Sequence, residues 1–137
     1  MPTSQPGRCS QELNATLSVL TQNNSLSIET KSKIAEEIMR IHSTVMSVPR
    51  NFVRVVFLSY PVGSGYTAGA ADPTAAINCI LRSGHRAAEK ADLLRQVWSM
   101  FQNLTGMATD QLAISLQEIP SSNAMEMGEI VQSVGSD

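Results

Sequence analysis

The sequence lacks any dense block of lysine and arginine, and it lacks a long hydrophobic run. Ten Lys and Arg residues stand against twelve Asp and Glu residues, which gives a formal net charge of −2. Proteins that bind nucleic acid or anionic membranes through charge carry a concentrated basic patch. The longest apolar runs, such as "FVRVVFL", are broken by charge and are far shorter than the roughly 20 residues of a membrane span. We therefore expect no nucleic-acid partner and no membrane partner.

Cysteine is also scarce, and a signal-peptide pattern is missing. Cys9 and Cys79 match no metal-binding spacing, so a reduced pair of thiols is the default expectation. The opening stretch "MPTSQPGRCSQELN" contains no apolar core of the signal-peptide kind. We expect a cytoplasmic protein with no metal and no cofactor. Its 137 residues are enough for one domain with a single core.

The first half of the chain has the periodicity of a helix flanked by strands. Residues 32–48 place apolar side chains at helical spacing and charged side chains on the other face. Residues 52–58 are rich in β-branched and aromatic side chains, which predicts a strand. Residues 14–22 supply a candidate strand before the helix, and Ser27 or Thr30 is a candidate helix cap. This order predicts one βαβ unit.

The same order of apolar positions returns in the second half of the chain at a constant offset in numbering. A shared helical period can align two unrelated helices by chance, but it does not also keep the loop length and the terminal proline in register. The matched pairs are Ile34 with Leu93, Ile38 with Val97, Ile41 with Met100, Val45 with Leu104, Val48 with Met107, Val53 with Leu112, Val55 with Ile114, Phe57 with Leu116, and Pro61 with Pro120. The sequence therefore predicts two copies of one βαβ unit.

Two such units predict an α+β fold, in which tandem βαβ units form a four-stranded sheet with two helices on one face. The two strands of each unit should lie parallel, joined by a right-handed crossover helix. Strands such as "FVRVVFL" carry apolar residues on both sides, so the uncovered face needs a partner and we expect an oligomer. The expected segments are an N-terminal extension at 1–14, a domain at 15–128 and a tail at 129–137, where the domain comprises βαβ units at 15–61 and 74–120, a linker at 62–73 and a hairpin or turn at 121–128.

Three short motifs carry a resemblance to a known family. They are "AEEIMRIHS" in the first helix, "LRSGHR" before the second helix and "LQEIP" at the end of the last strand. In this order and spacing the chain resembles the tautomerase superfamily, and within it the cis-3-chloroacrylic acid dehalogenase group. The similarity covers residues 26–61 and 82–128. It implies two βαβ units, assembly as a homotrimer and a site for a small carboxylate.

The resemblance also implies roles for particular residues. The histidine of the group's first helix falls on His42, the first of its two substrate-binding arginines falls on Arg82, and its carboxylate near the end of the last strand falls on Glu118. Such a site holds a carboxylate through the cations and the histidine, while the glutamate helps to activate water in hydration or dehalogenation. This chemistry is sensible, because fixed cations orient a carboxylate and a nearby carboxylate can act as a general base.

The chain departs from the family pattern at two positions. The second arginine falls on His85, with Arg86 alongside, and a histidine near its unperturbed pKa of about 6.5 is largely neutral at pH 7. The family's catalytic N-terminal proline falls on Ala15, counted back from His42 without gaps. An internal alanine offers only an amide nitrogen, so the usual acid or base is missing. Pro2, exposed if Met1 is removed, is a poor substitute because a long segment containing Pro6 and Gly7 separates it from Ala15.

Structural interpretations remain open beside the functional ones. His42 can be a packing residue, since the repeat places Phe101 at the equivalent position, and Glu118 can be a polar residue at a strand end. Arg82 and Arg86 can be solvated, although cations near a helix start oppose the helix dipole. Three functions follow: weak or no tautomerase, hydratase or dehalogenase activity on small 2-oxo or unsaturated acids without the proline, a non-catalytic carboxylate-binding or scaffold trimer, and a tautomerase that uses Pro2 after Met removal.

Overall fold

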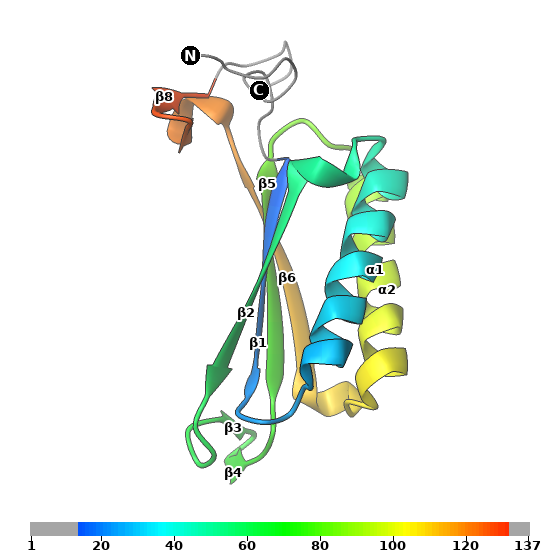
Figure 1. Ribbon diagram of the computed structural model, residues 1–137, viewed down its shortest axis with the longest axis vertical. Coiled ribbons are helices and arrows are strands. Elements are labelled where there is room, and N and C mark those ends of the chain that lie inside the picture. The colour runs from blue at the N-terminus through cyan, green and yellow to red at the C-terminus, as the bar shows by residue number, and fades with distance from the viewer. Residues whose placement is uncertain (1–13, 132–137) are drawn as a thin grey trace.

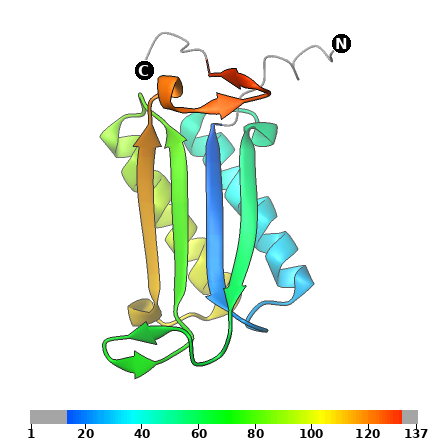
Figure 2. The ribbon, with the colours of Figure 1, turned by 90° about the vertical axis from the view of Figure 1, so that its left-hand side faces the viewer.

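The protein is a four-stranded sheet whose one face is covered by two antiparallel helices (Figures 1 and 2). The computed structural model describes residues 14–131. The main elements are β1 (Ala15–Gln22), α1 (Ile28–Met46), β2 (Val53–Tyr60), β5 (Ala75–Arg82), α2 (Ala87–Thr105) and β6 (Leu112–Ile119). The predicted α+β class, the four strands and the placement of both helices on one face are confirmed.

The sheet has the order β2-β1-β5-β6. The pairs β1–β2 and β5–β6 are parallel, as predicted for each βαβ unit, and the two units meet through the antiparallel pair β1–β5. This central pairing sets Ala15 at the start of β1 opposite Leu81 near the end of β5. As a result, the start of β1 and the ends of β5 and β6 lie at one end of the sheet, the upper end in Figure 1.

The repeat in sequence is also a repeat of structure. The offset that relates Ile34 to Leu93 also relates both ends of α1 to those of α2, and both ends of β2 to those of β6. The region expected as a linker forms the hairpin β3–β4 (Tyr66–Thr67 and Ala70–Ala71), and the C-terminal region forms the hairpin β7–β8 (Met125–Glu126 and Glu129–Ile130). These hairpins are related by the same offset and occupy opposite ends of the sheet (Figure 2). The repeat therefore extends beyond the βαβ units predicted from the sequence.

Helix boundaries follow from local capping. The hydroxyl of Ser27 accepts the backbone N–H of Thr30 at 3.1 Å, so α1 begins at Ile28, earlier than the periodicity indicates. Ser47 ends α1 in the left-handed region with φ 57°, and Gly106 ends α2 in the same way with φ 71°. Ser47 and Gly106 are equivalent positions of the repeat, so the repeat includes the stop signals of the helices.

The core lies between the helices and the sheet. Buried side chains alternate along β1 and β5, whereas the helices contribute a stripe at three- and four-residue spacing. Phe101 on α2 is the largest completely buried side chain, and His42 on α1, at the equivalent repeat position, is also completely buried. The two repeat units therefore place an aromatic ring at the same point of the core, but only one of the rings can hydrogen bond.

The other face of the sheet carries exposed aliphatic side chains. Val56, Leu58 and Ile80 are 39%, 51% and 41% exposed, and neither helix covers them. An uncovered apolar sheet face is a surface that normally contacts another protein surface. No helix within residues 14–131 is long and apolar enough to cross a membrane.

Candidate active site

The candidate site lies at the end of the sheet where β1 starts and β5 and β6 end. Ala15 is buried in β1, in register with Val53 and Leu81. The preceding residue, Asn14, donates its backbone N–H to the carbonyl of Phe52 at 2.6 Å. Its own carbonyl accepts the backbone N–H of Arg82 at 3.2 Å. The nitrogen of Ala15 is thus an internal amide inside a hydrogen-bonded strand, and Pro2 lies outside the described residues.

His42 is a neutral histidine inside the fold. Its Nε2 atom lies 2.6 Å from Oδ1 of Asn14, and because an amide oxygen only accepts, Nε2 carries the proton. Burial, assisted by the nearby charge of His85, lowers the pKa of His42 to about 4. The Nδ1 atom consequently keeps its lone pair, and it has no hydrogen-bond partner within the described chain. The interpretation of His42 as a packing residue with a fully hydrogen-bonded ring therefore holds for Nε2 but not for Nδ1.

Glu118 is held as a carboxylate on the helix-facing side of β6. Lys90, in the first turn of α2, places its Nζ atom 2.8 Å from Oε1 of Glu118. This hydrogen bond is the main reason that the pKa of Glu118 lies below its ordinary value. A hydrogen bond from the His85 backbone and the charge of the His85 ring act in the same direction. Glu118 is thus ionised at neutral pH, ready to accept a proton but weakened as a base.

His85 interacts with both of the other groups. Its charge acts on both His42 and Glu118, and its backbone hydrogen bonds to Glu118. The Nε2 atom of His85 is buried and has no hydrogen-bond partner within the described chain. The fold thus brings together His42, His85 and Glu118, which are far apart in sequence. Two residues that the motifs did not select contact this group: Asn14 bonds to His42, and Lys90 bonds to Glu118. In the sequence, the signal for Lys90 is its identity with Lys31 at the equivalent position of the repeat.

The two arginines are placed differently from this group. Arg82 is the last residue of β5, and because Leu81 faces the helices, strand alternation directs Arg82 to the open side of the sheet. There its Nη2 atom forms an ion pair with Glu126 of the hairpin β7–β8. Arg86 is the N-cap residue of α2, is largely exposed, and pairs with Glu89 at 3.3 Å. Each arginine is therefore already paired with a carboxylate of the chain.

Unpaired buried polar atoms are concentrated in this region. Within the described residues, four buried side-chain nitrogen or oxygen atoms lack a hydrogen-bond partner. Three of them belong to predicted site residues: Nδ1 of His42, Nε2 of His85 and Nε of Arg82. Leaving such an atom unpaired costs about 1–3 kcal/mol, so a chain does not normally accumulate them. That three of these atoms belong to predicted site residues is typical of a site in which a ligand or water supplies the missing hydrogen bonds.

At the opposite end of the sheet, the positions equivalent to the predicted site residues carry different side chains. The repeat equivalent of His42 is Phe101, and that of Glu118 is Ser59. Arg82 closes β5 as Gln22 closes β1. The backbone has therefore built two similar sheet ends, but at these equivalent positions only one end carries a histidine, a glutamate and an arginine.

Solved structures of similar fold are the known proteins that this chain matches. No family model matches the chain, and no curated protein matches it by sequence. The native crystal structure of a protein called Ps01740 is 29% identical, with a TM-score of 0.78 over 81% of this chain and 99% of the other. The protein N1, a member of the cis-3-chloroacrylic acid dehalogenase family, is 25% identical, with a TM-score of 0.80 over 88% of this chain and 85% of the other. The chain has the fold of the tautomerase superfamily and is similar to a member of the cis-3-chloroacrylic acid dehalogenase family.

The resemblance to the cis-3-chloroacrylic acid dehalogenase group is thereby confirmed by structure. A fused 4-OT protein, solved as an asymmetric trimer, has the same fold at 19% identity, with a TM-score of 0.80 over 88% of this chain and 98% of the other. The predicted site residues occupy the places described above, and their roles are taken up as a proposal below.

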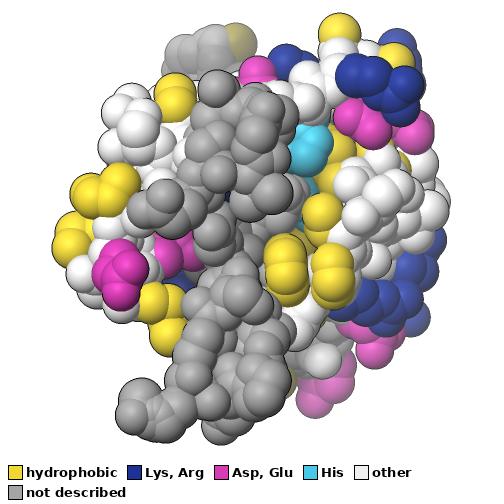
Figure 3. All heavy atoms as spheres, turned by 90° about the horizontal axis from the view of Figure 1, so that it is seen from above, with side chains coloured by type: hydrophobic (Ala, Val, Ile, Leu, Met, Phe, Trp, Pro, Cys, Tyr) yellow, Lys and Arg dark blue, Asp and Glu magenta, His cyan; other side chains and the backbone are white. Residues whose placement is uncertain are grey.

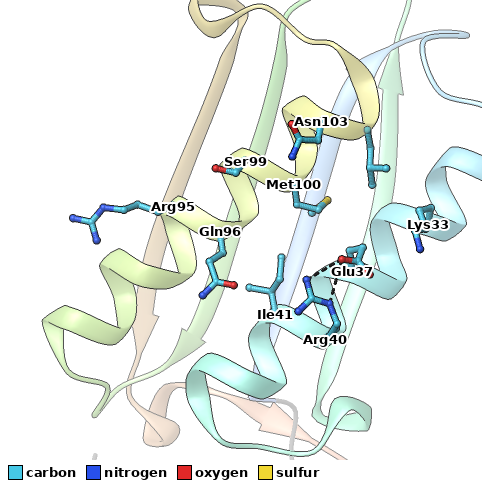
Figure 4. Close-up of a pocket in the computed structure, with 10 residues that line it drawn as sticks. Lys33, Glu37, Arg40, Ile41, Arg95, Gln96, Ser99, Met100 and Asn103 are labelled. Carbon is cyan, nitrogen blue, oxygen red and sulfur yellow. Dashed lines mark hydrogen bonds and ion pairs between the residues drawn. The ribbon is translucent and has the colours of Figure 1, made fainter.

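Other surface features of this chain lie apart from the site. A groove of about 490 Å³ runs between α1 and α2 on the outer surface (Figure 4). Two of its charged residues, Glu37 and Arg40, neutralise each other at 2.8 Å. In contrast, the end of the sheet seen in Figure 3 presents histidine side-chain atoms at the surface. Within residues 14–131 there is no cluster of His, Cys, Asp and Glu that could hold a metal ion.

Proposed function

We propose that this chain binds a small 2-oxo or unsaturated carboxylic acid at the end of the sheet described above, and that it catalyses slow tautomerisation or hydration without an N-terminal proline. One observation carries the proposal: three of the residues that the resemblance assigns to the site each present a buried nitrogen without a partner within the described chain. A ligand with one carboxylate and one oxygen substituent supplies the missing partners. The proposal names the ligand class and leaves the identity of the acid to experiment.

Each residue has a role that its surroundings suit. Arg82 at the end of β5 binds the carboxylate of the ligand through Nε, and His85, in the loop that directly follows β5, contacts it through Nε2. Neutral His42 accepts a hydrogen bond at Nδ1 from a hydroxyl or an acid proton of the ligand. Glu118 accepts the proton of an enol hydroxyl or of an attacking water. Because Ala15 supplies no amine, carbon protonation falls to solvent, and the expected rate is low.

The second candidate function is non-catalytic binding of the same class of acid. The contact between Lys90 and Glu118 favours it, because Lys90 holds the pKa of Glu118 below its ordinary value. A carboxylate with a low pKa is a weak general base at neutral pH. Both candidates share the binding site, so activity measurements on variants that still bind separate them.

Activity should depend on Glu118 if the chain is catalytic. The Glu118→Gln variant removes the proton acceptor but keeps the size of the side chain, so the rate of ketonisation of enol-phenylpyruvate should fall at least about tenfold. The loss of enol absorbance measures this rate. Pro2→Ala is the matched test of the N-terminal amine and should leave the rate unchanged.

The outcomes of this experiment are distinct. If Pro2→Ala abolishes turnover, Pro2 is the catalyst and the proline-free proposal is wrong. If Glu118→Gln binds pyruvate as the unaltered chain does and neither turns over the enol, the chain is a binding protein. If pyruvate neither raises the melting temperature nor binds in calorimetry, the proposed function fails as a whole.

We further propose that the open face of the sheet forms the interface of a homotrimer. The exposed Val56, Leu58 and Ile80 and the trimeric fused 4-OT relative support this. The full chain should sediment with the mass of three 14.8-kDa chains. Leu58→Glu should shift the mass to one chain, because a buried unpaired carboxylate is costly. Ser99→Glu, on the outer side of α2, is the charge-matched control and should remain trimeric. A monomeric unaltered chain would contradict the proposal.

A further inference from the structure

The contact between Arg82 and Glu126 joins the candidate site to the C-terminal hairpin. Glu126 is the second residue of β7 and its carboxylate pairs with Nη2 of Arg82. Both side chains are largely buried, with 16% and 23% of their surfaces exposed, so solvent screens the pair only partly. The cation that the family resemblance assigns to a substrate carboxylate is therefore already occupied by a carboxylate of the chain itself.

The hairpin that carries Glu126 stands outside the four-stranded sheet. Its strands β7 and β8 are two residues long and pair only with each other within the described sheets. Met125, Met127 and Ile130 are exposed, and Val131, directly after the hairpin, is the nearest buried aliphatic side chain. Segments with few buried apolar contacts open locally at lower free energy than the core. The carboxylate on Arg82 thus belongs to a segment that can be displaced more easily than a core strand.

The first repeat unit supplies a comparison within the same molecule. The hairpin β3–β4 has the same length and spacing as β7–β8, with a residue of positive φ before the glycine in each. At the position of Glu126 it carries Thr67, and at the position of Arg82 the strand carries Gln22. The hairpin fold therefore does not require an ion pair. The acid and the base occur together only at the end of the sheet that has the candidate site.

The guanidinium of Arg82 is only partly satisfied by this contact. Glu126 contacts Nη2, whereas Nε is buried and has no hydrogen-bond partner within the described chain. A carboxylate that approaches Nε and Nη2 together makes two parallel hydrogen bonds, which is the stronger arrangement for arginine. A small carboxylate therefore has a geometric advantage over Glu126, which is tethered to the hairpin.

We propose that Glu126 is an internal competitor for the carboxylate position on Arg82, so that the C-terminal hairpin restrains ligand binding until an acid displaces it. This inference rests on the proposed function, because it concerns the same cation. It predicts that the chain binds small carboxylates weakly because Glu126, which is not one of the predicted site residues, competes with them for Arg82. A single substitution in the hairpin should therefore strengthen binding, although it adds no contact to the ligand.

The test is calorimetric titration of the full chain with pyruvate. Glu126→Gln, and Glu126→Thr, which copies Thr67 of the first hairpin, should each lower the Kd for pyruvate at least fivefold. Glu129→Gln removes the same charge from the register partner of Glu126 in the same hairpin and should leave the Kd within twofold. Adding Arg82→Ala to Glu126→Gln should abolish the gain, which shows that it acts through this cation.

The outcomes separate this inference from the proposed function. If the unaltered chain binds pyruvate and neither Glu126 variant binds more tightly, the inference is wrong while the proposed site stands. An equal gain in Glu129→Gln also overturns it, because general electrostatics then explains the effect. If pyruvate binds neither the unaltered chain nor the Glu126 variants, a freed Arg82 holds no carboxylate and both proposals fail. Melting curves of each variant confirm that it is folded before titration.

Discussion

Replacing Phe101 with alanine should lower the free energy of unfolding by about 3–5 kcal/mol. The ring is completely buried between the helices and the sheet, so its removal loses transfer free energy and leaves a cavity. Urea unfolding at a fixed chain concentration measures the change. Fixed concentration matters because association contributes to the stability of an oligomer.

The control for this substitution is Val62→Ala. Val62 is 74% exposed, so its truncation should change the free energy of unfolding by less than about 0.5 kcal/mol. A cost below about 1 kcal/mol for Phe101→Ala would mean that the core collapses around the missing ring. The described packing of α2 against the sheet would then be wrong.

His42, which occupies the position of Phe101 in the first unit, should make the folded protein less stable in acid. His42 has a pKa lowered to about 4 by burial, compared with 6.5 for an unperturbed histidine. Between these values the unfolded chain binds a proton that the folded chain excludes, so stability falls as the pH falls. The stabilisation that the buried neutral ring of His42 gives to the folded chain is fully present above pH 6.5 and is largely lost at pH 4. The shift corresponds to about 3 kcal/mol.

The His42→Phe variant isolates this contribution, because it installs the ring that the second unit already uses. The difference in unfolding free energy between the unaltered chain and the variant should fall by about 3 kcal/mol from pH 7 to pH 4. Groups that do not interact with His42 titrate equally in both proteins and cancel, and His85, whose charge acts on His42, is followed in the same titration. A nuclear magnetic resonance titration of the His42 ring should show its midpoint near pH 4. A midpoint near 6.5 and a constant difference would show that the ring is hydrated.

These two positions explain why the repeat alone does not reveal function. The pattern of apolar residues treats His42 and Phe101 as equivalent core positions, and both are completely buried. Their difference appears only in the hydrogen bond from His42 to Asn14 and in the unpaired Nδ1 atom. A buried imidazole therefore meets the packing need of the first unit and presents a polar atom at the same time.

Much of the candidate site follows from sequence, but its internal connections do not. The motifs select His42, His85 and Glu118, and the fold brings these residues together. The partners that set their charge come from register and helix placement, which motifs do not encode. Lys90 reaches Glu118 across 28 positions in sequence. The pairing of Arg82 with Glu126 spans 44 positions and depends on where the C-terminal hairpin lies.

Periodicity by itself determined two helices, four main strands and a doubled βαβ unit, because burial on one side of each element demands a regular spacing of apolar side chains. The sequence likewise places Ala15 where the family resemblance expects the catalytic proline, and an alanine within a chain has no amine. Only the tertiary structure decided that the two units join through an antiparallel β1–β5 pair, that one end of the sheet gathers the titratable groups, and that Glu126 occupies Arg82. Such contacts depend on distances between segments that are remote in sequence. The periodicity of one segment predicts its own secondary structure, but it does not determine which strand that segment pairs with.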